Sequence, residues 1–287
     1  SRFLPLVGLS GLQPKRRYLV TPYTTAKTHT TVPDTGDPFN DGRINEAALG
    51  ADFKLGLGSN LTLDATINPD FGQVEVDPAV VNLSDVESFF DEKRPFFIEG
   101  SDTFGFGWGG ASNNMSFNFS NPNLFYSRRI GRTPQGYVED ADHVNAPSGV
   151  RINAAAKITG KVAGAWNLGV LQAFTGETKA DVSLAGRLSR AVVEPRASYT
   201  IARAQRDFAG GRQGLGFIGT FVNRDLTGTG LENQFNRRAA AFGVDGWTTF
   251  GRGKGNERIW ALTGRFAVST LSGTAARLYD VQRASQH

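Results

Sequence analysis

Two neighbouring runs of alternating residues constrain this chain more than any other feature. From 47 to 57 an apolar side chain stands at every second position, and the same alternation returns from 61 to 67. The Gly58-Ser59 pair between them is short enough for a tight connection, and strict alternation is typical of a strand with two unlike faces. The sequence therefore predicts an antiparallel hairpin with one apolar face and one polar, charged or glycine face.

The alternation recurs in the second half of the chain, which predicts an all-β, antiparallel fold. An earlier extended run, 17–26, contains Pro22, which cannot donate a ladder hydrogen bond and therefore predicts an edge or irregular strand. The remaining predicted strands, of which the last two alternate less regularly, are 165–174, 239–250, 258–268, 196–206 and 214–224.

The alternating faces fit two architectures. In a soluble sandwich or lipocalin-like barrel the apolar face is the core, whereas in a membrane barrel the apolar face meets lipid and the polar face lines the lumen. The polar face here is rich in Ala and Gly with isolated charges, and 35 of 287 residues are glycine, against roughly 7% on average. Small residues suit a crowded lumen, and no apolar run approaches the roughly 18 residues of a membrane helix. We therefore predict an antiparallel transmembrane β-barrel over 1–287.

Connection lengths indicate how such a barrel is arranged. Short connections at 57–60, 159–163, 208–213 and 251–256 contrast with longer polar ones at 27–42, 175–195, 225–237 and beyond 270. Outer-membrane barrels have this asymmetry between short turns and long loops. Residues 69–148 then form one excursion on the long-loop side, too long for a structureless loop. We expect this insertion to fold as a plug or cap, in a barrel whose abrupt first and last residues suggest a fragment.

Within the insertion, turns, a short helix and one strand are expected. Residues before proline avoid the helical region, so Pro69 and Pro78 predict turns. Ser84 and Glu87 have the spacing of a capping box, which predicts a helix of about two turns ending before Pro95. Residues 124–132 are predicted as a strand.

Three separated motifs in the insertion resemble a known family. They are Asn68-Pro-Asp-Phe-Gly-Gln-Val-Glu75, Glu92-Lys-Arg-Pro-Phe-Phe-Ile-Glu-Gly100 and Phe125-Tyr-Ser-Arg-Arg-Ile-Gly131. Together they are similar to the C-terminal domain of unknown function that follows a family 9 carbohydrate-binding-like module in bacterial envelope proteins. The resemblance covers nearly the whole chain and implies an outer-membrane β-barrel, longer than this chain.

Charged residues around the insertion have two interpretations. They could recognise an anionic or sugar ligand, or they could form an internal salt-bridge network, because charges buried in a barrel must be paired. We favour a network that fixes the insertion to the lumen like a latch. Its candidates are Asp52, Lys54, Asp64, Glu92, Lys93, Arg94, Glu99, Arg128, Arg129 and Arg132.

A dense group of acids is a candidate calcium site. Asp70, Glu75 and Asp77 lie close together in the sequence, and calcium takes carboxylate and carbonyl oxygens. Their spacing is not that of an EF-hand, and Asx turns alone would select acids beside proline. We therefore expect no cofactor, with calcium as the alternative.

Other classes of function have little support in the sequence. The balance of 31 basic and 27 acidic residues lacks the clustered charge of a nucleic-acid binder. There is no cysteine, and His29, His143 and His287 have no metal-ligand spacing. We expect a non-enzymatic protein of the bacterial outer membrane, surrounded by lipid, acting as a plugged or gated channel or as an anchor for an attached module. The alternatives are a structural subunit that docks another envelope protein and, less favoured, a surface enzyme acting on glycans.

Overall fold

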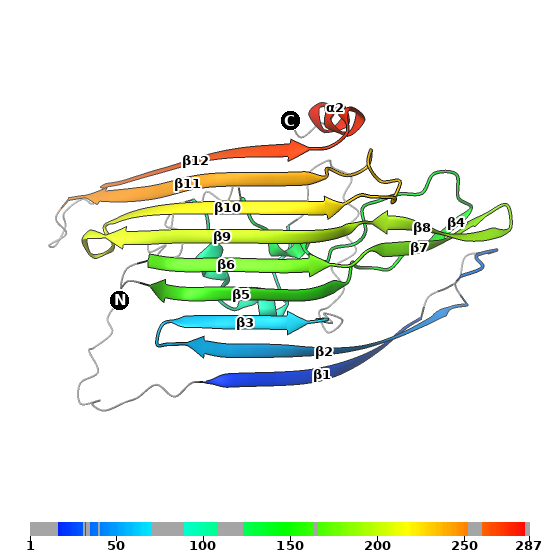
Figure 1. Cartoon of the computed structure of the whole chain (residues 1–287), viewed down its shortest axis with the longest axis horizontal. Coiled ribbons are helices and arrows are strands. Elements are labelled where there is room, and N and C mark those ends of the chain that lie inside the picture. The colour runs from blue at the N-terminus through cyan, green and yellow to red at the C-terminus, as the bar shows by residue number, and fades with distance from the viewer. Residues whose placement is uncertain are drawn as a thin grey trace.

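A computed structural model describes residues 17–69 apart from 31, 33, 34 and 40, and residues 89–107, 123–162, 166–251 and 260–284. Its strands pair antiparallel in two sheets (Figure 1). The main sheet has nine strands in the order β1 (Tyr18–Thr30), β2 (Arg43–Leu57), β3 (Leu61–Ile67), β5 (Ile152–Val162), β6 (Trp166–Thr175), β9 (Arg196–Phe208), β10 (Gln213–Asp225), β11 (Arg238–Phe250) and β12 (Trp260–Ser272). The small sheet contains β4 (His143–Asn145), β7 (Thr178–Leu184) and β8 (Arg187–Glu194).

The all-β prediction and the first hairpin are confirmed. Strands β2 and β3 pair with Leu55 opposite Leu63 and Lys54 opposite Asp64, so apolar and charged residues stand on separate faces. Strand β1, which contains Pro22, lies at an edge of the sheet as predicted. The closed barrel is not found, because β1 and β12 do not pair with each other within the described part of the chain. Among the described residues, each edge strand has a neighbour on one side alone, and the sheet that they form is open.

Two predicted long loops contain regular structure instead. The segment 175–195 forms the β7–β8 hairpin, whose turn residues Ala185 and Gly186 both have positive φ, as a two-residue hairpin connection requires. The segment beyond 270 contains α2 (Ala275–Arg283), where the Thr274 hydroxyl accepts a hydrogen bond from the Arg277 N–H at 3.2 Å. Both segments mix apolar with polar residues. In β7, Ala180, Val182 and Leu184 alternate with polar residues, but over a run of only seven residues.

The insertion also differs from its predicted secondary structure. The short helix α1 (Pro95–Ile98) begins at Pro95 rather than ending before it, because proline favours the first helical position. Residues 84–88 of the predicted helix lie outside the described part, and Phe89 and Phe90 are not helical. The strand predicted over 124–132 is wrong, since the 3₁₀ turn η3 (Ser127–Arg129) stands there. A second 3₁₀ turn, η1 (Ser101–Phe104), follows α1, and a third, η4 (Ala209–Gly211), joins β9 to β10.

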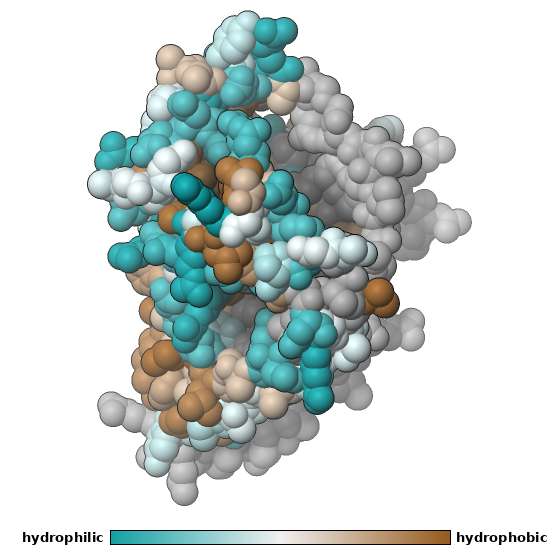
Figure 2. Space-filling model, turned by 90° about the vertical axis from the view of Figure 1, so that its right-hand side faces the viewer, coloured by the Kyte–Doolittle hydropathy of each residue, from teal (hydrophilic) through white to brown (hydrophobic). Residues whose placement is uncertain are grey.

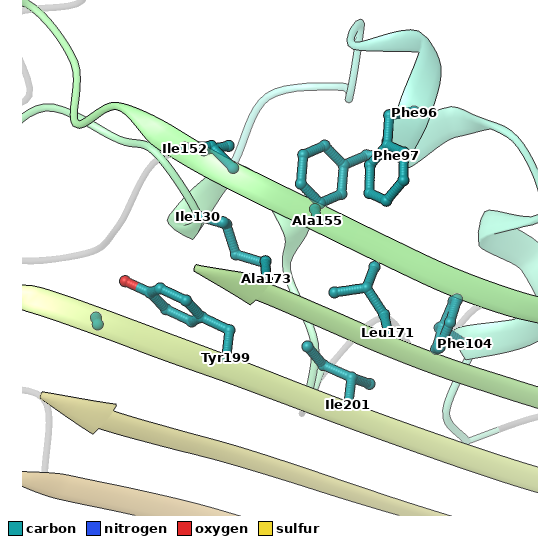
Figure 3. Packing of buried hydrophobic residues seen from close by; sticks show 11 residues of the cluster. Phe96, Phe97, Phe104, Ile130, Ile152, Ala155, Leu171, Ala173, Tyr199 and Ile201 are labelled. Atoms are coloured by element: carbon teal, nitrogen blue, oxygen red, sulfur yellow. The ribbon is translucent and has the colours of Figure 1, made fainter. Parts of the chain in front are cut away.

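The hydrophobic core lies between the insertion and one face of the main sheet, which we call the inner face. Figure 3 shows Phe96, Phe97 and Phe104 of the insertion directed toward the strands. The strands contribute alternate residues, so that the core continues through Ile152, Ala155, Leu171, Ala173, Ala197, Tyr199 and Ile201. Ile130, next to η3, packs into the same cluster.

The opposite face of the sheet, the outer face, carries large apolar side chains that are exposed. Trp260 is 70% exposed and Phe266 is 67% exposed, whereas Lys157 and Asp245 on the inner face are 2% and 1% exposed. An antiparallel sheet in water normally buries its apolar face and solvates its polar face. In this sheet, buried charges stand among the core residues of the inner face, and the large apolar side chains of the outer face are exposed. Its outer residues include Ile67, Val170, Phe174, Leu215, Phe217, Phe221, Phe242, Val244, Leu262 and Val268, all exposed.

Glycines on the inner face make room for the insertion. A Cβ at Gly243 would lie 2.6 Å from side-chain atoms of Phe106 and Leu124, and one at Gly169 would lie 2.9 Å from Thr103. Gly264 on β12, by contrast, has nothing within 4 Å of its Cβ position. Part of the high glycine content is therefore explained by close packing of the insertion on the sheet.

This packing predicts different responses from two glycines. Gly243→Ala should destabilise the protein by about 1–3 kcal/mol, the usual cost of overpacking, because Phe106 and Leu124 must move. Gly264→Ala on the open outer face is the matched control and should leave stability nearly unchanged. Denaturant titrations would measure both, and equal stabilities for the two variants would contradict the packing.

Candidate functional site

The candidate site is the set of charged contacts that attach the insertion to the inner face. Its centre is Lys157 of β5, whose ammonium donates to the backbone carbonyls of Phe96 and Glu99. The same ammonium lies 4.8 Å from the centre of the Phe96 ring. A cation at the last carbonyls of a helix satisfies acceptors that the helix leaves open. Lys157 therefore holds α1 against the sheet.

A second lysine extends this contact across the strands. Lys54 of β2 forms an ion pair with Glu99 and stands 3.9 Å from Asp64. Asp64 is opposite both Lys54 and Lys157 in the strand register, so one buried carboxylate lies between two cations. The Lys54 and Glu99 side chains are 39% and 55% exposed, and exposed ion pairs contribute little stability. Lys157 is thus the stronger of the two attachments.

Glu92 and Arg94 connect two parts of the insertion. The Arg94 Nε and Nη2 atoms each lie 2.7 Å from a Glu92 carboxylate oxygen. The guanidinium also donates to the carbonyls of Ile130 at 2.6 Å and Ser127 at 2.8 Å, and it lies 4.2 Å from the Phe97 ring centre. These bonds explain why residues 127–130 form a turn, since their carbonyls bind a side chain rather than a neighbouring strand.

Glu92 remains ionised in this buried position. Burial by itself would raise the pKa of Glu92, but the hydrogen bonds and charge of Arg94 lower it, and the Ser127 hydroxyl adds a further hydrogen bond. The net effect is a pKa below the ordinary 4.5. The Glu92 carboxylate is therefore ionised near neutral pH, where it pairs with Arg94.

A fully buried ion pair lies further along the inner face. Arg203 of β9 and Asp245 of β11 form two parallel bonds of 2.5 and 2.8 Å, and both side chains are completely buried. The Gly107 N–H of the insertion donates to the same carboxylate at 2.9 Å. Strand β10 lies between β9 and β11. A Cβ on its Gly216 would lie 2.5 Å from an Asp245 carboxylate oxygen. A glycine between them thus allows the pair to form.

A further buried carboxylate lies at the end of a strand of the small sheet. Glu194 of β8 accepts a hydrogen bond from the Gln135 N–H at 2.9 Å. Burial raises the pKa of Glu194, opposed by this hydrogen bond and by the charges of Arg224 and Arg132. The Arg224 guanidinium donates to the Asn236 carbonyl at 3.1 Å. This group connects the insertion, the small sheet and β10.

The residues selected from the sequence have different positions. Five of them take part in the contacts above: Lys54, Asp64, Glu92, Arg94 and Glu99. The positive charge of Arg132 lowers the pKa of Glu194. Arg128 donates to the Asp91 carbonyl at 2.8 Å, while Lys93 and Arg129 are exposed. Asp52 is exposed on β2. Asp70, Glu75 and Asp77 lie outside the described residues, so the calcium prediction stays untested.

Sequence reasoning missed Lys157, Arg203, Asp245, Glu194 and Arg224. The signal for Lys157 is a single lysine in the small, apolar segment 154–158. Arg203 and Asp245 are separated by an intervening strand, so no local spacing connects them.

The arrangement is suited to attachment. In the described part of the chain, no group of three or more His, Cys, Asp or Glu residues is placed to hold a metal ion. The charged side chains bind backbone carbonyls, backbone N–H groups or each other. Such contacts hold two layers together. Of the helices in the described ranges, none is both long and apolar enough to cross a membrane.

The buried ion pair predicts a non-additive response to mutation. Asp245→Leu should cost about 3–5 kcal/mol because it leaves the Arg203 charge buried without its partner. Combining it with Arg203→Met should recover most of that loss, since apolar replacement of a whole buried pair is often neutral. Denaturant titrations would decide, and a double variant as unstable as Asp245→Leu would contradict this assignment.

Glu92 predicts a pH dependence of stability. Because its pKa is lowered in the folded protein, its stabilising effect is complete above pH 4.5 and is lost as the pH falls through the lowered pKa. The difference in unfolding free energy between the unaltered protein and Glu92→Gln should be constant near neutral pH and shrink in acid. A difference that grows on acidification would contradict the ionised Glu92–Arg94 pair.

Comparison with known proteins identifies the family. No curated protein and no solved structure matches the chain. A family model described as a domain of unknown function, DUF5916, matches residues 14–258. The match begins before β1 and ends before β12, so it includes eight of the nine strands of the main sheet, the insertion and the small sheet. The chain therefore belongs to the DUF5916 family of domains of unknown function.

Proposed function

We propose that this chain forms the wall of an outer-membrane β-barrel whose interior is filled by the insertion. In this proposal the outer face of the main sheet meets lipid and the inner face lines a lumen. The protein acts as a plugged or gated channel, or as the membrane anchor of an attached carbohydrate-binding-like module. The attached module is an inference from the resemblance of the three motifs described above.

The exposed apolar outer face is the observation that carries this proposal. Side chains such as Phe242, Phe266 and Trp260 are more than half exposed, while the charges of Lys157, Arg203 and Asp245 are buried. Exposing large apolar residues to water is unfavourable by about 25 cal/mol for each Å². Lipid removes that cost, and strands of a membrane barrel alternate apolar outside with polar inside.

Aromatic residues at one end of the outer face support the same proposal. Phe208, Phe250 and Trp260 stand at strand ends on the side of the short connections, and Phe250 is directly opposite Trp260. Arg206 lies over the rings of Trp166 and Phe208 at 5.8 and 5.0 Å. Aromatic residues with nearby polar groups gather at the membrane–water boundary. The opposite end, seen in Figure 2, has a largely hydrophilic surface, as expected for loops in water.

The attachment contacts favour a plug. Phe96, Phe97 and Phe104 form a hydrophobic core with the inner face, and Lys157 and Asp245 bind the insertion's backbone. A segment held in this way would occupy the lumen at rest. Opening would require release of these contacts, of which the exposed Lys54–Glu99 pair is the weakest.

The second candidate is a subunit that docks another envelope protein. The same apolar outer face favours it, because a protein partner could cover that face instead of lipid. The two candidates differ in what surrounds Trp260.

Tryptophan fluorescence separates them. Trp260 projects from the outer face, whereas Trp247, near the same end, projects from the inner face over Gly214. Two variants should be reconstituted in vesicles, each retaining one of these residues, with the other tryptophans, including Trp108 and Trp166, changed to Phe. Brominated lipid should quench Trp260 strongly and Trp247 weakly, because bromine quenches on contact. Trp260 shielded from both lipid bromine and aqueous iodide would favour the docked partner and contradict the lipid-facing wall.

A further inference from the structure

The two edges of the main sheet are long, and the edge formed by β12 is apolar. Strands β1 and β12 each have 13 residues, and within the described residues each pairs with a strand on one side only. On β12, Trp260, Leu262 and Phe266 are all more than 60% exposed. An unpaired backbone edge in lipid costs several kcal/mol for each polar group. An edge in contact with lipid must therefore be paired.

Strand direction restricts how the sheet can close. All eight contacts between the described strands of the main sheet are antiparallel, so β1 and β12, the first and ninth of these strands, run in the same direction. If β1 and β12 met directly, their seam would be parallel. An antiparallel barrel needs an even number of strands, so an odd number must be added to these nine.

We propose that the free edge of β12 binds an antiparallel strand from the same polypeptide, and that an odd number of such strands separates β12 from β1. This inference rests on the proposed membrane location. We assign this strand to the same polypeptide because neighbouring strands of the main sheet are also consecutive along the chain among the strands of that sheet. Even the insertion and the β7–β8 hairpin return the chain to the neighbouring position, as short, uncrossed connections favour.

The alternation of side chains on β12 predicts the sequence pattern of the strand that pairs with its free edge. Outer residues of β12 are Trp260, Leu262, Phe266 and Val268, and the inner residues between them include Ala261, Thr263, Ala267 and Ser269. A strand pairing there must alternate in the same sense, because side chains directly opposite each other share a face. It will therefore have apolar residues outward and small or polar residues inward.

Hydrogen exchange of the full-length protein in membranes tests the pairing. Amides on both edges of β12 should be protected about as well as those of β11, which has neighbours on both sides. Fast exchange at every second amide of β12, with β11 protected, would show a free edge and overturn the proposal.

Disulfide trapping in cysteine-free full-length protein identifies the neighbour. Phe242 and Val268 are opposite each other on β11 and β12, so Phe242→Cys with Val268→Cys is the positive control. Thr24→Cys on β1 should form no disulfide with a cysteine introduced at 264, 266, 268 or 270 on β12. Such a bond would show a direct parallel seam, and a dimer linked through Val268→Cys alone would show a second copy. Either result overturns the proposal.

The hydrogen-exchange result for β12 can be distinguished from the fluorescence result that tests membrane location. Quenching of Trp260 by lipid with a freely exchanging β12 edge would retain the membrane proposal and reject this closure. A protected β12 edge with Trp260 shielded from lipid would show a paired edge outside the membrane, and would reject the membrane proposal instead.

Discussion

Burial of charge on the inner face is the constraint on which the rest of the structure depends. Lys157 and the Arg203–Asp245 pair are almost fully removed from solvent, and a buried charge must be paired or hydrogen-bonded. The insertion supplies the partners of Lys157 through the carbonyls of Phe96 and Glu99. Arg203 and Asp245 pair with each other, and the Gly107 N–H of the insertion adds a hydrogen bond to Asp245. Without the insertion, Lys157 would lose the carbonyls to which it donates and Asp245 would lose one hydrogen bond, so the sheet depends on the insertion.

The close packing around these buried charges also explains the glycines of the inner face. Gly216 leaves space for the Arg203–Asp245 pair, and Gly243 leaves space for Phe106 and Leu124. The insertion then closes on the sheet through Phe96, Phe97 and Phe104, which form its apolar contact. Other large apolar side chains of the strands are exposed on the outer face, and these exposed side chains motivate the proposed lipid-facing wall.

Much of the sheet could be predicted from its sequence because alternation is a local signal. The β2–β3 hairpin, the edge position of β1 and the strands near 165–174 and 239–250 all follow from it. The β7–β8 hairpin was missed although Ala180, Val182 and Leu184 alternate with polar residues, because this run is short, at seven residues. The strand at 124–132 was wrong because the Arg94 guanidinium, distant in sequence, binds the carbonyls there. Charged pairs across strands depend on register, which no local spacing reveals.

The central claim is that the outer face of the sheet lies against lipid. Spin labels on full-length protein in vesicles measure this directly at Val170, Phe217 and Phe266, with Leu188, exposed on the separate β8 strand, as the water-exposed control. The account predicts that labels at the first three positions collide with oxygen, which dissolves in lipid, and not with a water-soluble nickel chelate. The control should show the reverse. Frequent collisions of the outer-face labels with the nickel chelate would contradict the claim.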